Sequence, residues 1–187
     1  MAIKKWKLIA SDYLFRQTWF TVRKDKCETD EGKIIDPYFV FEFPEWATAL
    51  PITNEGKIIM VKQYRHALDV ISIELPGGCI DPTDKDPEAG ISRELMEETG
   101  YAFDEVISLG TTSPNPSTNS NLMHMFLMKG GRKINEQQLD HNEEIEVMEI
   151  SFDELKDLID QHKIIQSMHL TTIFYALRYL QKLQWKS

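Results

Sequence analysis

The segment from Leu75 to Tyr101 constrains this 187-residue chain more than any other part of its sequence. It reads LPGGCIDPTDKDPEAGISRELMEETGY, and three glutamates, Glu94, Glu97 and Glu98, fall within five residues just before a glycine. On a helix with about 100° per residue, these three side chains share an arc of roughly 100°. We therefore expect an acidic face, and opposite it a core-packing face formed by Ala89, Ser92, Met96 and Thr99.

An acidic face at the end of a helix is electrostatically unfavourable by itself. Neighbouring like charges cost a few tenths of a kcal/mol per pair, and the helix dipole disfavours negative charge in the last turns. A bound cation would remove this penalty, and a hard divalent ion such as Mg²⁺ prefers oxygen ligands. The alternative interpretation is a solvated helix end that is rich in glutamate.

The flanking residues favour the cation site. Asp86 suits the N-cap position, Pro87 suits the first turn, and Gly100 suits the left-handed stop after the helix, so a helix is predicted over 87–99. Upstream, Pro76-Gly77-Gly78 follows an apolar strand and lets the backbone approach a ligand closely. Together these features predict a glycine turn facing a capped acidic helix.

This segment resembles the Nudix box, the signature of Mg²⁺-dependent hydrolases that cleave a diphosphate linked to another moiety. The signature reads Gly, five residues, Glu, seven residues, then Arg-Glu-aliphatic-x-Glu-Glu-x-Gly-aliphatic. Seven positions match it: Gly78, Arg93, Glu94, Leu95, Glu97, Glu98 and Gly100. The first Glu is replaced by Asp84, one extra residue precedes Arg93, and the last position is Tyr101. We expect the extra residue to lengthen the loop and leave the helix intact.

The resemblance extends over most of the chain, to the ADP-ribose pyrophosphatase branch of this family. The further motifs occur in the branch's order: Gln63-Tyr64-Arg65, Glu74-Leu75-Pro76-Gly77-Gly78, Ser113-Pro114-Asn115-Pro116 and Glu143-Glu144-Ile145-Glu146-Val147. The resemblance implies an α/β/α sandwich with a mixed β-sheet, in residues 46–187. It also implies an N-terminal antiparallel β-sheet extension, residues 1–45, that crosses to a second subunit and forms a homodimer.

Within this framework the acidic helix supplies the metal ligands. We assign Glu94 and Glu98, four residues apart, as the principal ligands of Mg²⁺, with Mn²⁺ as the alternative ion, and Glu97 as an additional ligand. The resemblance implies that the carbonyl group of Gly77 completes the shell. Arg93 is expected to assist catalysis by holding a glutamate in an ion pair; the alternative is an exposed surface pair.

The catalytic base must come from another segment, since the helix glutamates are occupied. Relatives of this branch supply a loop glutamate in the region of Asp140–Glu146, where Glu143 matches best and Glu144 is the reserve choice. The alternative interpretation of this loop is a solvated acidic turn.

The substrate contacts are expected on both sides of the glycine turn. A guanidinium binds phosphate through two parallel hydrogen bonds, so Arg65 is the best phosphate contact, unless it forms a structural ion pair. Gly78 permits close approach of the backbone. Trp19 and Tyr38 could stack on a nucleobase or could pack within the sheet and dimer interface. The loop that begins with Ser113 and Pro114 is expected to line the sugar side.

Composition narrows the function further. The formal net charge of −9 argues against a basic nucleic-acid binder, and the hydrophobic fraction of 42% suffices for a sizeable core. The two cysteines, Cys27 and Cys79, form neither a disulfide framework nor a metal-ligand pattern, so we expect reduced thiols in a cytoplasmic protein. No signal peptide or membrane-spanning run is expected. The implied partner is a small nucleotide-sugar substrate, with no nucleic acid and no membrane.

Hydrophobic periodicity indicates the remaining elements. We predict strands at 7–10, 18–23, 38–43, 47–53, 57–64, 71–75, 106–111, 122–128 and 145–150, with a charged turn segment at 24–33 and a hairpin turn at 54–56. A capping box at Ser151 opens a helix to about Gln161. A final helix is predicted from Ser167 to about Gln184, with an inward face of Leu170, Ile173, Phe174, Leu177, Leu180 and Leu183.

Three functions are compatible with this sequence. The first is a Mg²⁺-dependent hydrolase that cleaves ADP-ribose, or a related nucleoside diphosphate sugar, to a nucleoside monophosphate and a sugar phosphate. The second keeps this chemistry but uses a GDP-sugar, a UDP-sugar or a dinucleotide. The third is a nucleotide-sugar-binding regulator with impaired catalysis, for which the changes at Asp84 and in the loop length would be the mark.

Overall fold

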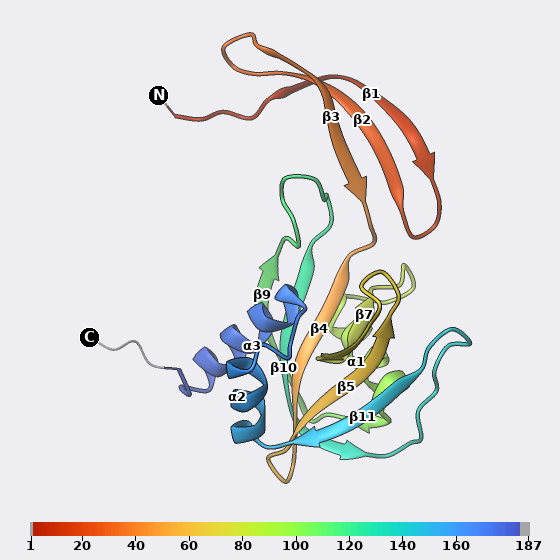
Figure 1. The fold of residues 1–187 in the computed structure, drawn as a ribbon, viewed down its shortest axis with the longest axis vertical. Helices are drawn as coiled ribbons and strands as arrows, with labels where there is room; N and C mark the ends of the chain where they lie inside the picture. Colours follow the sequence, from red (N-terminus) through yellow and green to blue (C-terminus); the bar gives the residue numbers. More distant parts are fainter. Residues whose placement is uncertain (1, 184–187) are drawn as a thin grey trace. The chain divides into compact units, whose positions relative to one another are not determined.

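A computed structural model describes residues 2–183 of the chain (Figure 1). The chain separates into two compact units. The first consists of Met1–Glu45 and Ser113–Leu122, and the second consists of Trp46–Thr112 and Met123–Ser187.

The first unit contains a three-stranded antiparallel sheet in the order β1-β2-β3, formed by β1 (Lys7–Arg16), β2 (Thr21–Glu28) and β3 (Ile34–Glu42). The strands are longer than predicted, and half of the expected charged turn at 24–33, residues 24–28, belongs to β2. Only 29–33 forms the turn, where Gly32 N donates to the Thr29 carbonyl. Charged residues fit β2 because they pair across the sheet, as Lys24 does with Asp12 at 3.7 Å.

The second unit is built on an eight-stranded mixed sheet. Its central order is β11-β5-β4-β10-β8, while β6, β7 and β9 pair with β5, β4 and β10 respectively. The strands β4 and β10 run parallel to each other. The bounds are β4 (Trp46–Thr53), β5 (Ile58–Arg65), β6 (Val70–Glu74), β7 (Gly77–Cys79), β8 (Tyr101–Ala102), β9 (Glu105–Thr112), β10 (Met123–Lys133) and β11 (Ile145–Ile150).

The predicted hairpin turn at 54–56 is confirmed, and Gly56 adopts a positive φ of 76° within it. The two strands nevertheless pair only at Ile52 and Ile58. Beyond that point β4 pairs with β10 and β7, whereas β5 pairs with β6 and β11. The sheet therefore opens between β4 and β5, on the side where the glycine turn follows β6.

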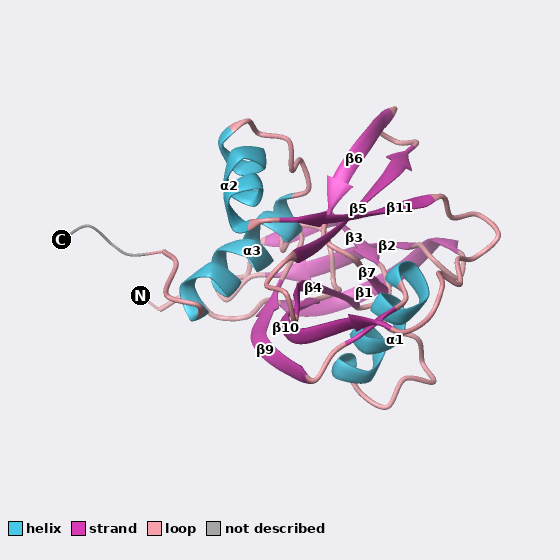
Figure 2. Ribbon diagram, turned by 90° about the horizontal axis from the view of Figure 1, so that it is seen from below, coloured by secondary structure: helices cyan, strands magenta, loops and turns pink. Residues whose placement is uncertain are grey.

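Helices cover both faces of this sheet (Figures 1 and 2), with α1 (Pro87–Thr99) on one face and α2 (Phe152–Asp160) and α3 (Ser167–Tyr179) on the other. Successive residues of a strand point to opposite faces, so a strand buried on both sides is continuously apolar. Ala47, Ala49, Phe126 and Met128 accordingly pack with Ile91 and Leu95 of α1. Leu50 and Leu127 pack with Leu155 of α2 and Ile173 of α3. The predicted α/β/α sandwich with a mixed sheet is confirmed.

The helix ends confirm the capping arguments in two cases. α1 has Asp86 as its N-cap and Gly100 as a left-handed C-cap with φ 76°. In α2 both hydrogen bonds of the capping box between Ser151 and Glu154 are present. The boundaries of these two helices therefore follow from local sequence.

The prediction for the last helix was wrong in two respects. α3 ends at Tyr179, because the chain turns at Gln181 with φ 56°; Gln184 lies outside the described residues. The inward face was predicted only in part: Ile173 is buried and Leu177 and Leu180 pack against the core, whereas Leu170, Phe174 and Leu183 are exposed. His169, Thr172 and Ala176 complete the buried face, because small and polar side chains also pack against the sheet. Within residues 2–183 no helix combines the length and apolarity needed to cross a membrane.

Candidate active site

The glycine turn packs its backbone directly against neighbouring groups. Gly77 has φ 148°, and a Cβ there would overlap the Ala47 carbonyl group of β4. A Cβ on Gly78 would meet the carboxylate of Glu94 at 2.5 Å. At Gly77, where the clash is with backbone, only glycine therefore allows β7 to lie against β4, whereas a side chain at Gly78 would displace the Glu94 carboxylate.

Glu98 is the most buried carboxylate of the helix, with 4% of its surface exposed. Its Oε2 accepts a hydrogen bond from Gly77 N at 2.9 Å. The prediction that Ala89, Ser92, Met96 and Thr99 form the core face was wrong except for Thr99, because the core side chains are Ile91 and Leu95. These two residues lie four apart, and Glu98 follows Leu95 by three, so the carboxylate lies at the edge of the apolar stripe.

The ionised forms of the two buried carboxylates, Glu94 and Glu98, are unfavourable unless positive charge lies nearby. Burial above all, together with the charges of Glu94 and Glu143, raises the pKa of Glu98 to about 8. Burial likewise raises the pKa of Glu94 to about 7, against the opposing effect of Arg93. A divalent cation would favour the ionised form of both side chains.

The donor set fits a hard cation, although no ready-made cluster of three or more His, Cys, Asp or Glu side chains occurs within residues 2–183. In this structure Glu94 and Glu97 contact Arg93 at 3.0 and 2.9 Å, and Glu98 contacts the glycine turn. Carboxylate oxygens are the donors that Mg²⁺ and Mn²⁺ prefer. Glu94 and Glu98 are therefore the residues that would hold such an ion.

Arg93 lies at the centre of an acidic cluster. Its Nε and Nη2 donate to the two carboxylate oxygens of Asp84, at 3.1 and 3.0 Å, and Nη2 also donates to the Cys79 carbonyl group. Asp84 in turn accepts from the backbone N–H of Asp81. The loop with the extra residue is thus fixed onto the helix by Asp84, and the helix keeps its predicted bounds. In the sequence, Asp84 stood out only as a departure from the Nudix box. Its position in that motif was the only indication that it contacts Arg93.

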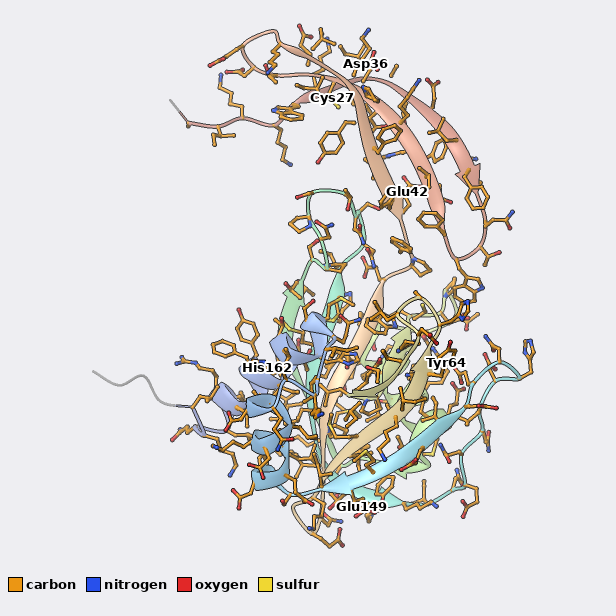
Figure 3. The ribbon with its side chains drawn as sticks, viewed as in Figure 1. Cys27, Asp36, Glu42, Tyr64, Glu149 and His162 are labelled. Carbon is orange, nitrogen blue, oxygen red and sulfur yellow. The ribbon has the colours of Figure 1, made fainter. Side chains whose placement is uncertain are left out.

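Arg65 forms a bidentate ion pair with Glu74, a residue for which no role was predicted. The nitrogens Nε and Nη2 of Arg65 donate to Oε1 and Oε2 of Glu74 at 2.9 and 2.6 Å. Although burial opposes it, this hydrogen bonding lowers the pKa of Glu74. Tyr64, the preceding residue on β5 (Figure 3), is exposed and donates to Asp69 instead. Glu74 thus orients the guanidinium, whose side chain remains 39% exposed.

The acidic loop before β11 contains the two candidates for the catalytic base, Glu143 and Glu144. Glu143 lies close enough to the site to affect the pKa values of its residues. Glu143 raises the pKa values of Glu94 and Glu98, after the larger effect of burial, and also that of Arg65. Its Oε2 accepts a hydrogen bond from Asp140 N at 3.2 Å. Glu144 is exposed in the same loop.

Four predicted substrate contacts belong to the first unit. Trp19 is 66% exposed, and the Tyr38 hydroxyl group donates to the Ser117 carbonyl group at 2.6 Å. Ser113 and Pro114 begin the segment that packs with this unit and are partly buried. Their roles stay predictions.

His169 of α3 is a structural residue, with 1% of its surface exposed. Its Nδ1 accepts a hydrogen bond from Leu75 N at 3.3 Å, and its ring stacks on Trp46. The neutral ring must therefore carry its proton on Nε2. Neither Trp46 nor His169 had a sequence signal, since the two residues lie far apart in the chain.

Protonation of His169 should destabilise the protein in mild acid. Burial lowers its pKa from 6.5 to about 4. The unfolded chain therefore binds the proton more readily, and the free energy of unfolding should fall as the pH drops from about 6.5 to 4, by up to about 3 kcal/mol. Urea unfolding across this range should show a steeper loss for the wild type than for His169→Asn. Equal slopes would contradict the buried neutral ring.

Comparison with known proteins supports one family. The model of the NUDIX domain matches residues 44–168, and that of the nucleoside diphosphate sugar hydrolase N-terminal domain matches residues 6–41. Among similar proteins, the ADP-ribose pyrophosphatase of Bacillus subtilis (strain 168) is 30% identical, covering 94% of this chain and 92% of the relative. The methanol dehydrogenase activator of Bacillus methanolicus is 29% identical, covering 90% and 91%.

Two further similarities concern specificity and fold. The GDP-mannose pyrophosphatase of Yersinia pestis (strain Pestoides F) is 29% identical, covering 87% of each chain. A crystal structure of an ADP compounds hydrolase has the same fold, with a TM-score of 0.85, 19% identity and 97% of each chain covered. Since the family model spans most of the chain and the box residues occupy the sandwich as expected, the chain belongs to the Nudix family and is a pyrophosphohydrolase.

Proposed function

We propose that this chain hydrolyses the diphosphate of a nucleoside diphosphate sugar, with ADP-ribose as the leading substrate and Mg²⁺ as the metal. AMP and ribose 5-phosphate would be the products. The observation that carries the proposal is the buried Glu98 on the same helix as Glu94, hydrogen-bonded to Gly77 N at a position where only glycine fits. The names of the ADP-ribose pyrophosphatase relatives support the choice of substrate.

Each residue of the site has a task in this reaction. A divalent ion, when bound, neutralises the diphosphate and polarises the attacking water. Glu94 and Glu98 hold it, with Glu97 and the Gly77 carbonyl group as further ligands, while Asp84 and Arg93 keep the helix and its loop together. These assignments agree with the ion pairs of Arg93.

The remaining tasks belong to residues outside the helix. Arg65, oriented by Glu74, binds a phosphate oxygen through its free N–H groups. Glu143 accepts the proton of the attacking water, and Glu144 is the reserve base. Gly78 allows close approach of the substrate, while Ser113, Pro114, Trp19 and Tyr38 contact the nucleoside or the sugar.

A hydrolysis panel tests the proposed substrate class. The panel consists of ADP-ribose, GDP-mannose, a UDP-sugar and a dinucleotide, each with Mg²⁺ or Mn²⁺, and the assay measures phosphomonoester release. We expect the highest kcat/KM for ADP-ribose with Mg²⁺. The relatives named GDP-mannose pyrophosphatase make GDP-mannose the second candidate. Binding of all four compounds without hydrolysis would contradict the proposal and indicate a regulator.

The N-terminal sheet should form a homodimer. All ten residues of β1 are exposed, and its apolar side chains lie on both faces of the strand: Leu8, Ile9, Tyr13, Leu14 and Phe15. Apolar surface of this extent marks an interface, and a second copy of the sheet would cover it. Light scattering should give twice the 21.8 kDa of one chain.

The variant Leu14→Glu should shift this mass toward one chain, because a charge would be buried in the interface. Ile134→Glu, an exposed apolar position of the second unit, is the matched control and should stay dimeric. A monomer in the wild type at micromolar concentration would refute the dimer.

We also propose a cytoplasmic location, which the two free cysteines, Cys27 and Cys79, support.

A further inference from the structure

A cavity of about 300 Å³ lies within the second unit, next to the candidate active site. Its walls come from the start of β4, the β5–β6 hairpin and the residues just before α3. The lining residues that carry the argument are Trp46, Arg65, Ser72, Glu74 and Gln166. Arg65 links the cavity to the candidate active site, because it lines the cavity and also interacts electrostatically with Glu98.

One wall of the cavity is an aromatic ring held in place from behind. The Trp46 ring stacks on the His169 ring with centroids 5.6 Å apart and an angle of 22° between the planes. His169 has 1% of its surface exposed and is fixed by the hydrogen bond from Leu75 N. Trp46 therefore offers a preorganised flat surface, and its position does not depend on a bound ligand.

The polar part of the lining is buried and incompletely satisfied. Ser72 has 2% of its surface exposed; its Oγ lies beside the Glu74 carboxylate and helps to lower the pKa of that group, but it makes no well-aligned hydrogen bond to any of residues 2–183. Glu74, equally buried, accepts one hydrogen bond from Arg65 on each oxygen, and its Oε2 also lies 3.9 Å from Nδ1 of His169, so lone pairs remain for a further donor. A buried hydroxyl group without a partner is costly, so a ligand that hydrogen-bonds to it would be favoured.

A polyhydroxylated ring matches this combination. Its apolar face can pack on an indole, and its hydroxyl groups can donate to Glu74 and exchange hydrogen bonds with Ser72 and Gln166. We propose that this cavity binds the sugar ring of the substrate, stacked on Trp46, with the adjacent phosphate at Arg65. This inference rests on the proposed function, since it takes Arg65 as a phosphate contact.

Product inhibition separates the sugar end of the substrate from the nucleoside end. The probes are ribose 5-phosphate and AMP, each tested against hydrolysis of ADP-ribose by the full chain with Mg²⁺. For Trp46→Leu we expect the inhibition constant of ribose 5-phosphate to rise about tenfold and that of AMP to stay within about twofold. Trp46→Phe, which keeps an aromatic face, should retain most of the affinity. Equal losses in both variants would overturn the stacking role.

Ser72→Ala tests the polar side independently and changes the volume very little. Because the Ser72 hydroxyl group makes no well-aligned hydrogen bond, the thermal midpoint should change little, while KM should rise about fivefold. An unchanged KM would overturn the proposed contact, even if Trp46→Leu failed to fold. Tyr175→Leu removes an exposed aromatic ring of α3 that does not line the cavity, and both inhibition constants should stay unchanged.

The sugar site and the proposed function can fail separately. A selective loss of AMP affinity in Trp46→Leu would place the base in the cavity and overturn the inference. If the wild type hydrolysed no nucleotide sugar, the proposed function would fail. Calorimetric titration of ribose 5-phosphate into wild type and Trp46→Leu would then still decide the inference, because equal affinities would reject it and a tenfold difference would support the sugar site.

Discussion

Glu98→Gln should lower kcat by about three orders of magnitude and leave the fold intact. Metal stabilisation of developing charge contributes several kcal/mol, and a neutral amide is a poor ligand for a hard cation. Glutamine has the same shape as glutamate, and its carbonyl oxygen can still accept the hydrogen bond from Gly77 N. The loss should therefore appear in steady-state hydrolysis of ADP-ribose, with an unchanged circular dichroism spectrum.

Glu88→Gln is the matched control for this variant. Glu88 lies in the first turn of the same helix and is exposed, so its replacement should leave kcat close to that of the wild type. A second measurement separates metal binding from catalysis. Mg²⁺ should raise the thermal midpoint of the wild type and of Glu88→Gln, and should raise it much less in Glu98→Gln. Hydrolysis by Glu98→Gln at the wild-type rate would refute the metal assignment.

The parts of the fold that depend on local sequence were predictable. The bounds of α1 follow from Asp86, Pro87 and Gly100, and the hairpin turn at 54–56 follows from its glycine. Each of these signals acts within a few residues, through a cap or a positive φ. The order of the predicted strands and helices indicated a mixed sheet covered by helices, and the family resemblance specified the α/β/α sandwich.

The orientation of the helices required tertiary information. The three glutamates of α1 were placed on one face correctly, but the opposite face was not the core face, because Ile91 and Leu95 approach the sheet beside Glu98. In α3 the small side chains of Thr172 and Ala176 take the buried positions. Periodicity reports which residues share a face, whereas the surface available for packing decides which face is buried.

The contacts that orient the candidate site come from pairs distant in sequence. His169 and Trp46 stack across more than half the chain, and Arg65 finds Glu74 across the β5–β6 hairpin. From the residue type alone, Arg65 could be either a substrate contact or part of a structural ion pair. Arg65 forms the ion pair with Glu74 through two of its five N–H donors and its side chain stays 39% exposed, so the two interpretations are compatible.

Glu143→Gln should reduce kcat by a factor of about 10² to 10⁴ and leave KM nearly unchanged, because a general base acts in the transition state and contributes little to substrate affinity. Steady-state hydrolysis of ADP-ribose with saturating Mg²⁺ would measure both parameters, and a rise in KM with an unchanged kcat would contradict the role of Glu143 as base.

Glu144→Gln is the control for Glu143→Gln, since Glu144 is the neighbouring exposed carboxylate of the same loop and the reserve candidate. The Mg²⁺-dependent rise of the thermal midpoint should persist in Glu143→Gln, in contrast to Glu98→Gln, because the base is not assigned as a ligand. Loss of turnover together with loss of the Mg²⁺ effect would identify Glu143 as a ligand instead. Wild-type turnover in Glu143→Gln with a slow Glu144→Gln would transfer the role to Glu144, whose side chain would then have to reach the same water.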